Sequence, residues 1–168
     1  MNNKIVTIII LIILVIGGAY FLFDTVSNNN SILGVSHFNK DNISFDYPSM
    51  WIKDNSTDYN LTFHSLFYTI NLDIYDISDT SFEDQVDVFL HDNSDSEINY
   101  TVIKINEIMV DGQKAYDISS QFDKDGKFYY RVLVFESNNK MYIFGFLSDN
   151  LNTVNNDFNL VKNSIKLK

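Results

Sequence analysis

Nitrogen and sulfur ligands for a metal ion are scarce in this sequence. Its three histidines, His37, His64 and His91, are far apart, and no two have the four-residue separation that places zinc ligands on one helix face. The 168 residues include no cysteine, which excludes disulfides, thiol nucleophiles, iron–sulfur clusters and thiolate zinc sites. We therefore expect ordinary surface or packed histidines and no cofactor.

Two groups of acidic residues could bind Ca²⁺ through carboxylate oxygens. The segment 123–126, Asp-Lys-Asp-Gly, resembles the start of an EF-hand loop, but the twelfth loop position is Val134 and not glutamate. We interpret this segment as a hairpin turn. Asp92, Asp95 and Glu97 could hold Ca²⁺ weakly, and a solvated acidic loop from Asp92 to Glu97 is the simpler interpretation.

Motifs that would support catalysis are also missing. The chain has no G-x-S-x-G elbow, no H-E-x-x-H pair, no P-loop and no G-x-G-x-x-G turn. Carboxylates occur in pairs because acidic residues are abundant, with 22 Asp and Glu in the chain. We expect no catalytic residue and a protein that is not an enzyme. A binding role would instead use exposed aromatic side chains, and the candidates are Tyr59, Phe67, Tyr68, Tyr75 and Tyr129.

Asparagine could carry a modification in this chain. Asn-x-Ser/Thr sequons are acceptors for N-glycosylation in exported domains of hosts that glycosylate. Because asparagine is abundant here, several sequons are also expected by chance. The five candidates are Asn29, Asn42, Asn55, Asn60 and Asn99.

An apolar segment near the N-terminus predicts where these residues are located. Residues 5–23 carry no charge, and a helix of 19 residues spans roughly 28 Å, close to the hydrocarbon core of a bilayer. Lys4 precedes the segment and Asp24 follows it, so the positive-inside tendency predicts a cytoplasmic N-terminus, residues 1–4. The segment is longer than the core of most cleaved signals, which favours an anchor, although Thr25-Val26-Ser27 could serve as a cleavage site.

The rest of the chain is then an extracytoplasmic domain, residues 35–168, joined to the anchor by a flexible linker, residues 24–34. The whole chain carries 12 Lys and Arg against 22 acids, a formal charge of -10. This acidity argues against nucleic acid and against an anionic membrane surface as partners, because both are bound through clustered cations.

Periodicity in this domain predicts strands around one helix in its first half. Ile43–Tyr47 alternates apolar and polar residues, and Tyr68–Ile77 does the same, as half-buried strands do. Pro48 ends the first strand. Thr80 or Ser81 then caps a helix whose apolar residues recur at helical spacing at Phe82, Val86, Phe89 and Leu90.

The second half of the domain predicts a meander and a closing helix. Asp111-Gly112 and residues 137–140 are hairpin turns. A final helix fits Leu151–Asn163, capped by Ser148 or Asp149, and residues 164–168 form a short closing strand. The fold class is α+β, a mainly antiparallel sheet covered by helices. The meander strands are Tyr100–Val110, Lys114–Phe122, Phe128–Glu136 and Met141–Leu147.

Two short motifs, together with the meander, resemble a known family over residues 38–168. The first is the strand Ile43–Tyr47 followed by Pro48 and Trp51, and the second is the ending Phe158-x-x-Val161-x-x-Ser164-Ile165-Lys166. This combination is similar to the PsbP-like family, named for an extrinsic subunit of the oxygen-evolving photosystem. The resemblance implies an α/β/α sandwich. It also implies that Phe45, Tyr47, Pro48 and Trp51 are core and turn residues, not ligands.

These features together predict a membrane-anchored extracytoplasmic PsbP-like domain with a non-catalytic binding or assembly role at the cell envelope. Its partners would be the membrane, through residues 5–23, and another envelope or membrane protein. The alternative is a pilin-like surface subunit that self-assembles through its N-terminal apolar helix. The sequence leaves open the identity of the partner or ligand, cleavage of the helix, use of the sequons, oligomeric state, and weak Ca²⁺ or Mn²⁺ binding.

Overall fold

The computed structural model describes residues 34–40, 42–54, 60–64, 69–94, 99–123 and 126–168. Within these residues the chain forms two helices and ten strands. The helices are α2 (Phe82–Ser94) and α3 (Leu151–Ser164). The strands are β1 (Val35–Lys40), β2 (Ile43–Pro48), β3 (Ile52–Lys53), β4 (Asn60–His64), β5 (Thr69–Asp76), β6 (Asn99–Val110), β7 (Gln113–Asp123), β8 (Lys127–Ser137), β9 (Lys140–Ser148) and β10 (Lys166–Leu167).

Seven strands form the larger sheet, in the order β3-β4-β5-β9-β8-β7-β6, and each is antiparallel to its neighbours. The predicted meander is confirmed as β6 to β9. Asp111 and Gly112 both have positive φ, as do Asn138 and Asn139, which is the backbone conformation of type I′ hairpin turns. Strands β8 and β9 are central, which explains why their segments 132–135 and 142–146 are almost wholly apolar.

A smaller sheet of three strands, β1-β2-β10, brings the two ends of the described chain together. The predicted closing strand is confirmed as β10, which pairs antiparallel with β2. The hydroxyl of Ser164 at the end of α3 accepts a hydrogen bond of 2.8 Å from the Asp46 amide of β2. The helix, the short strand and the smaller sheet therefore form one connected unit.

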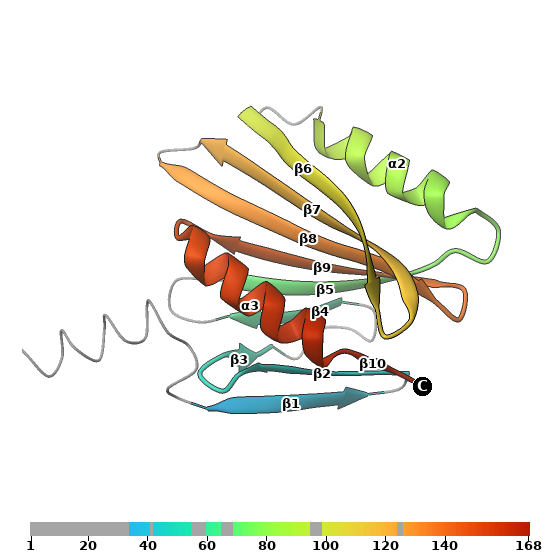
Figure 1. Ribbon diagram of the computed structural model, residues 1–168, viewed down its shortest axis with the longest axis horizontal. Coiled ribbons are helices and arrows are strands. Elements are labelled where there is room, and N and C mark those ends of the chain that lie inside the picture. The colour runs from blue at the N-terminus through green and yellow to red at the C-terminus, as the bar shows by residue number, and fades with distance from the viewer. Residues whose placement is uncertain (1–33, 41, 55–59, 65–68, 95–98, 124–125) are drawn as a thin grey trace, which may run out of the picture.

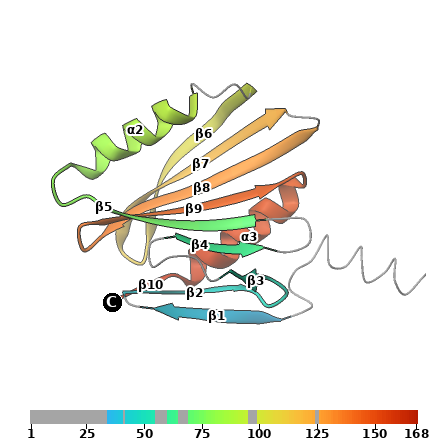
Figure 2. The same cartoon turned by 180° about the vertical axis from the view of Figure 1, so that it is seen from behind.

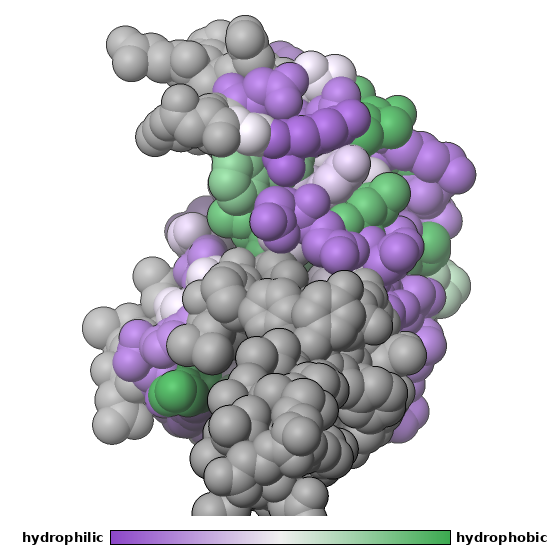
Figure 3. Space-filling model, turned by 90° about the vertical axis from the view of Figure 1, so that its left-hand side faces the viewer, coloured by the Kyte–Doolittle hydropathy of each residue, from purple (hydrophilic) through white to green (hydrophobic). Residues whose placement is uncertain are grey.

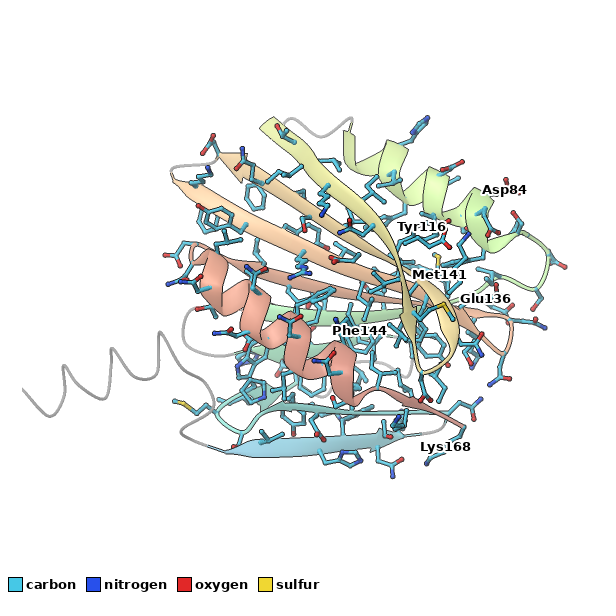
Figure 4. All side chains as sticks on the ribbon, viewed as in Figure 1. Asp84, Tyr116, Glu136, Met141, Phe144 and Lys168 are labelled. Carbon is cyan, nitrogen blue, oxygen red and sulfur yellow. The ribbon has the colours of Figure 1, made fainter. Side chains whose placement is uncertain are left out.

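The two helices cover opposite faces of the larger sheet (Figures 1 and 2). Helix α3 lies in front of the sheet in Figure 1 and behind it in Figure 2, on the same side as the smaller sheet. Among the residues labelled in Figure 4, Phe144 belongs to this side, whereas Tyr116 and Met141 lie beneath α2. A mainly antiparallel sheet with a helix on each face confirms the predicted fold class.

Aromatic rings join the two sheets in the interior. Phe45 of β2 has no exposed surface, and its ring centroid lies 5.0 Å from that of Phe144 on β9 and 5.7 Å from that of Phe63 on β4. These separations are within the range of about 4.5–7 Å at which edge-to-face rings attract each other. The strand predicted from Ile43–Tyr47 therefore supplies the side chain that connects the layers.

Three strands and two helix ends differ from the sequence prediction. Strands β1, β3 and β4 were not predicted, since β3 has two residues and β1 has one buried side chain, Phe38, which leaves no alternation to detect. The loop predicted from Asp92 is wrong in its first part, because α2 continues to Ser94. The cap of α3 is Asn150 and not Ser148 or Asp149. Its side-chain oxygen accepts hydrogen bonds from the amides two and three residues further on.

No helix among the described residues is long and apolar enough to cross a membrane. The predicted span, residues 5–23, the preceding residues 1–4 and the linker 24–34, apart from Gly34, lie outside the described residues.

Candidate functional site

Two hollows lie beside helix α2 on one face of the larger sheet. It begins after Ser81, whose hydroxyl oxygen accepts a hydrogen bond of 3.1 Å from the Asp84 amide, as a cap residue does. Glu83 and Asp84 stand in its first turn, where carboxylates interact favourably with the helix dipole. Phe82 and Val86 are buried against the sheet. Because only one stripe of the helix is buried, its two sides remain open along the sheet.

On the side of strand β5 lies an apolar hollow of about 210 Å³, which we call the α2 groove. Its floor is buried Met141 and Ile143 of β9. Val88 of α2 and Tyr75 of β5 form its rims, and these side chains are 51% and 49% exposed. A surface that keeps large apolar side chains in water at a concave position is typical of an interaction site. The α2 groove is lined by Tyr75, Gln85, Val88, Phe89, Met141 and Ile143.

Two carboxylates, Asp73 and Asp84, lie next to residues of the α2 groove. Asp73 stands directly opposite Ile143 in the strand register, on the same face of the sheet. Asp84, labelled in Figure 4, precedes Val88 by four residues and so lies one turn away on α2. Burial raises the pKa of the Asp73 carboxyl. Burial and the nearby Asp73 charge raise the pKa of the Tyr75 hydroxyl. The charged side chains identified beside the groove are therefore acidic.

On the other side of α2, near its start, lies a polar hollow of about 350 Å³. Lys114 lies between two carboxylates there, with Nζ 3.2 Å from Glu83 Oε1 and 3.4 Å from Glu107 Oε2. The hydrogen bond with Tyr116, followed by that with Glu83, raises the pKa of Lys114. Lys114 neutralises only part of the acidic charge of this hollow, because Glu136 also lines it. It is lined by Phe82, Glu83, Gln113, Lys114, Glu136, Ser137, Asn138 and Asn139.

The opposite face of the sheet holds a buried ion pair beneath α3. Arg131 of β8 donates two hydrogen bonds of 2.8 Å to the carboxylate of Asp117 on β7. Its third nitrogen donates to Asn155 Oδ1 at 2.8 Å, and its guanidinium carbon lies 3.7 Å from the centre of the Phe158 ring. This side chain therefore joins two strands to α3, and its donors are used in structural contacts. Neither its position nor its partners were predicted from the sequence.

The motif residues from the family resemblance lie in the interior or at its edge. Phe45, Pro48 and Trp51 are buried, and Tyr47 packs against the core at the strand end. The Trp51 amide donates a hydrogen bond of 3.0 Å to the Pro48 carbonyl, which closes the turn that folds the tryptophan back.

The sequons occupy different environments. Asn42 is exposed in the turn between β1 and β2. Asn60 and Asn99 are the first residues of β4 and β6. Asn29 and Asn55 lie outside the described residues.

The histidines and the other aromatic candidates are dispersed. The Nδ1 atom of His37 lies 2.7 Å from Asp46 Oδ1, and that of His64 lies 3.6 Å from Asp54 Oδ2. In the part of the chain that the structure describes, no three metal-binding side chains come together. Tyr129 is half-buried, and Lys127 lies over its ring. Tyr59, Phe67 and Tyr68 lie outside the described residues.

Sequence reasoning identified one of the six groove residues, Tyr75, as a candidate contact. Val88 carried a signal that was not used: it is an apolar residue between Asp87 and Phe89, off the stripe defined by Phe82 and Val86. The sequence gives no such signal for Met141 and Ile143, because buried strand residues have the same pattern whether or not a hollow lies above them.

Comparison with known proteins agrees with the architecture. The solution structure of cyanobacterial PsbP (CyanoP) from Synechocystis is similar with a TM-score of 0.64 and 21% sequence identity. The match covers 82% of this chain and 95% of that one. A crystal structure from Bacteroides thetaiotaomicron is similar with a TM-score of 0.55 and 10% identity, covering 75% of this chain and 45% of that one. No family model and no curated protein matches the sequence. The predicted resemblance is confirmed at the level of structure, and the chain has the PsbP-like fold.

Proposed function

We propose that the chain is a membrane-anchored PsbP-like domain with a non-catalytic binding or assembly role at the outer face of the cell envelope. Residues 5–23 would be the anchor, and the domain from residue 35 onward would bind another envelope or membrane protein. The observation that carries the binding role is the α2 groove, where Val88 and Tyr75 stay about half exposed above a buried apolar floor.

Two groups of paired charges, one beneath α3 and one at the surface, support a binding role over a catalytic one. The charged groups buried beneath α3, Arg131 and Asp117, satisfy each other through paired hydrogen bonds. Lys114 is held between Glu83 and Glu107. Such pairs use up the donors and acceptors that a reaction would need.

Location is tested by fractionation and by protease added outside intact cells. We expect the protein in the membrane fraction and the domain to be digested, because the predicted orientation places residues 35–168 outside. A protected domain, or a chain found in the cytosol, would contradict the proposal.

The binding role is tested by cross-linking intact cells and identifying linked peptides by mass spectrometry. We expect links from the domain to a different envelope protein. Links between copies through residues 5–23 would favour the pilin-like alternative, and an absence of any link to another protein would count against binding.

A further inference from the structure

The size of the α2 groove limits what it can hold. Its volume of about 210 Å³ lies below the roughly 300–1,000 Å³ of pockets that enclose drug-sized ligands. Its open rims, Val88 and Tyr75, do not close over an occupant. The space suits one large side chain presented by another polypeptide.

The floor indicates the chemistry of that side chain. Met141 and Ile143 are apolar and buried, and Phe89 adds a half-buried ring from α2. Thioether and aromatic groups adapt to aliphatic shapes and offer no hydrogen bond at the floor. An aliphatic side chain would therefore lose its contact with water there without leaving a polar group unpaired.

The charges around the α2 groove indicate what should flank that side chain. Asp73 and Asp84 lie beside it, and none of its six lining residues is basic. Lys140 is next to Met141 in the chain, but it pairs with Asp76, and successive strand residues face opposite sides of the sheet, so its side chain lies on the face away from the groove. A partner segment with cations on both sides of its apolar residue would complement the two carboxylates.

A second copy of this chain fits less well. Each copy carries a formal charge of -10 and would bring acidic residues to an acidic rim. The side of the molecule in Figure 3 is likewise mostly hydrophilic where it is described, with separate apolar groups between the polar ones. Charge complementarity therefore favours a different protein.

We propose that the α2 groove binds a partner protein through an aliphatic side chain that stands between lysine or arginine residues. This inference rests on the binding role proposed above and names the chemistry of the partner. It makes Val88, Tyr75 and Asp73 the residues that select the partner.

Nuclear magnetic resonance on the ¹⁵N-labelled full-length chain in zwitterionic detergent tests the proposal. The probe is a synthetic peptide with one leucine between two pairs of lysines. Two matched peptides replace the leucine by serine or the lysines by glutamates. We expect saturable amide shifts in α2, β5 and β9 with the leucine–lysine peptide, and binding at least about tenfold weaker with either control.

Two variants with similarly exposed parent residues separate the groove from general charge. Val88→Lys should weaken binding of the leucine–lysine peptide at least about tenfold, since it removes an apolar rim and adds a like charge. Leu151→Lys, on α3 and 46% exposed in its parent form, adds the same charge elsewhere and should have little effect. Circular dichroism checks that both variants fold.

Several results would overturn the proposal. Equal binding of the leucine and serine peptides would show that binding depends on charge alone and not on the groove. Equal weakening of binding by Val88→Lys and Leu151→Lys would show the same. Dimerisation abolished by Val88→Lys would assign the groove to a second copy. If no peptide binds while cross-linking in cells still finds a partner, the groove assignment fails and the binding role stands.

Discussion

At the scale of single residues, Arg131 shows how one partly buried charge can organise the interior. Its three donors reach Asp117 and Asn155, and its flat guanidinium stacks on Phe158. The side chain of Arg131 is 18% exposed and that of Asp117 is 7% exposed, so solvent screens the pair weakly. Bidentate geometry makes such a pair specific as well as strong. Its contribution is to set how α3 is oriented on the sheet.

Removing one partner of this pair should be costly. Arg131→Met leaves the Asp117 carboxylate buried without its donors, and we expect the free energy of unfolding to fall by about 3 kcal/mol. Unfolding in urea measures this loss of free energy. Lys127→Met is the matched control, because Lys127 is exposed and lies over the Tyr129 ring, a contact worth at most about 1 kcal/mol. Equal losses in the two variants would show that the buried pair has no special role.

At the scale of elements, the ends of helices and strands are held by specific side chains. Asn150 caps α3, and the Ser148 hydroxyl accepts a hydrogen bond of 2.8 Å from the Asn150 amide, which holds the cap in place. After the C-terminal end of α3, strand β10 is held by Asp111 of the β6–β7 turn. The Asp111 carboxylate accepts hydrogen bonds from the Leu167 amide at 2.8 Å and from Lys166 Nζ at 2.9 Å. The turn therefore holds strand β10 against the domain.

The identity of the α3 cap can be tested by alanine substitution. Asn150→Ala removes the acceptor for two amides, and we expect the free energy of unfolding to fall by about 1 kcal/mol. Asp149→Ala removes the residue that the sequence favoured as one of two caps, and its effect should be within about 0.5 kcal/mol. The denaturant midpoints of the two variants, each compared with that of the native chain, measure the two losses of stability. A larger loss for Asp149→Ala would contradict the cap assignment.

The Asp111 contact predicts an acid-sensitive strand. The Leu167 amide, followed by Lys166, lowers the pKa of Asp111 below its ordinary value of 3.8. A carboxyl whose folded pKa is depressed stabilises the fold above its unfolded pKa and loses that contribution as pH falls through the folded pKa. The contribution of Asp111 should therefore be complete above about pH 5 and fade below pH 3.8.

Melting temperature measured between pH 7 and pH 2.5 tests this prediction. Asp111→Asn preserves the turn, because Asn-Gly suits two positive φ angles, and it should show a shallower loss of stability at acidic pH than the native chain. Asp123→Asn, at the exposed end of β7, is the control for removing one carboxylate. Parallel curves for the native chain and Asp111→Asn would rule out the linkage.

At the scale of the whole molecule, two sheets and two helices share one aromatic interior. The smaller sheet and α3 cover one face of the larger sheet, and α2 covers the other (Figures 1 and 2). Phe45 and Phe144 connect the layers. Among the α2 residues whose burial is described, Phe82 and Val86 are buried, whereas α3 buries five residues. Two hollows remain beside α2 on the face that it covers.

The mass of the mature protein tests the predicted organisation of the whole chain. If residues 5–23 are an uncleaved anchor, the intact mass of the protein should correspond to the full 19.5 kDa chain. A mass above this value would indicate carbohydrate on a sequon, and if exposed Asn42 is the acceptor, Asn42→Gln should remove one such increment. Loss of residues 1–27 would contradict the anchor, and an unchanged glycan mass in Asn42→Gln would exclude that site.

Local sequence determined the meander, both helices and the hairpin turns of this protein. These features depend on residues close in the chain: the alternation along Ile43–Tyr47, the helical spacing of Phe82 and Val86, and the backbone freedom of Asp111-Gly112. The acidic charge and the apolar segment 5–23 are equally properties of sequence alone.

The tertiary structure alone decided which distant side chains meet. Arg131 finds Asp117 and Asn155, and the α2 groove combines Tyr75, Val88 and Met141 from three elements. Strand β1 exists because it pairs with β2, not because its own residues strongly prefer strands. Such contacts follow from strand order and from the angle at which a helix crosses a sheet. Hydrophobic periodicity carries information about which face is buried, and none about what that face is buried against.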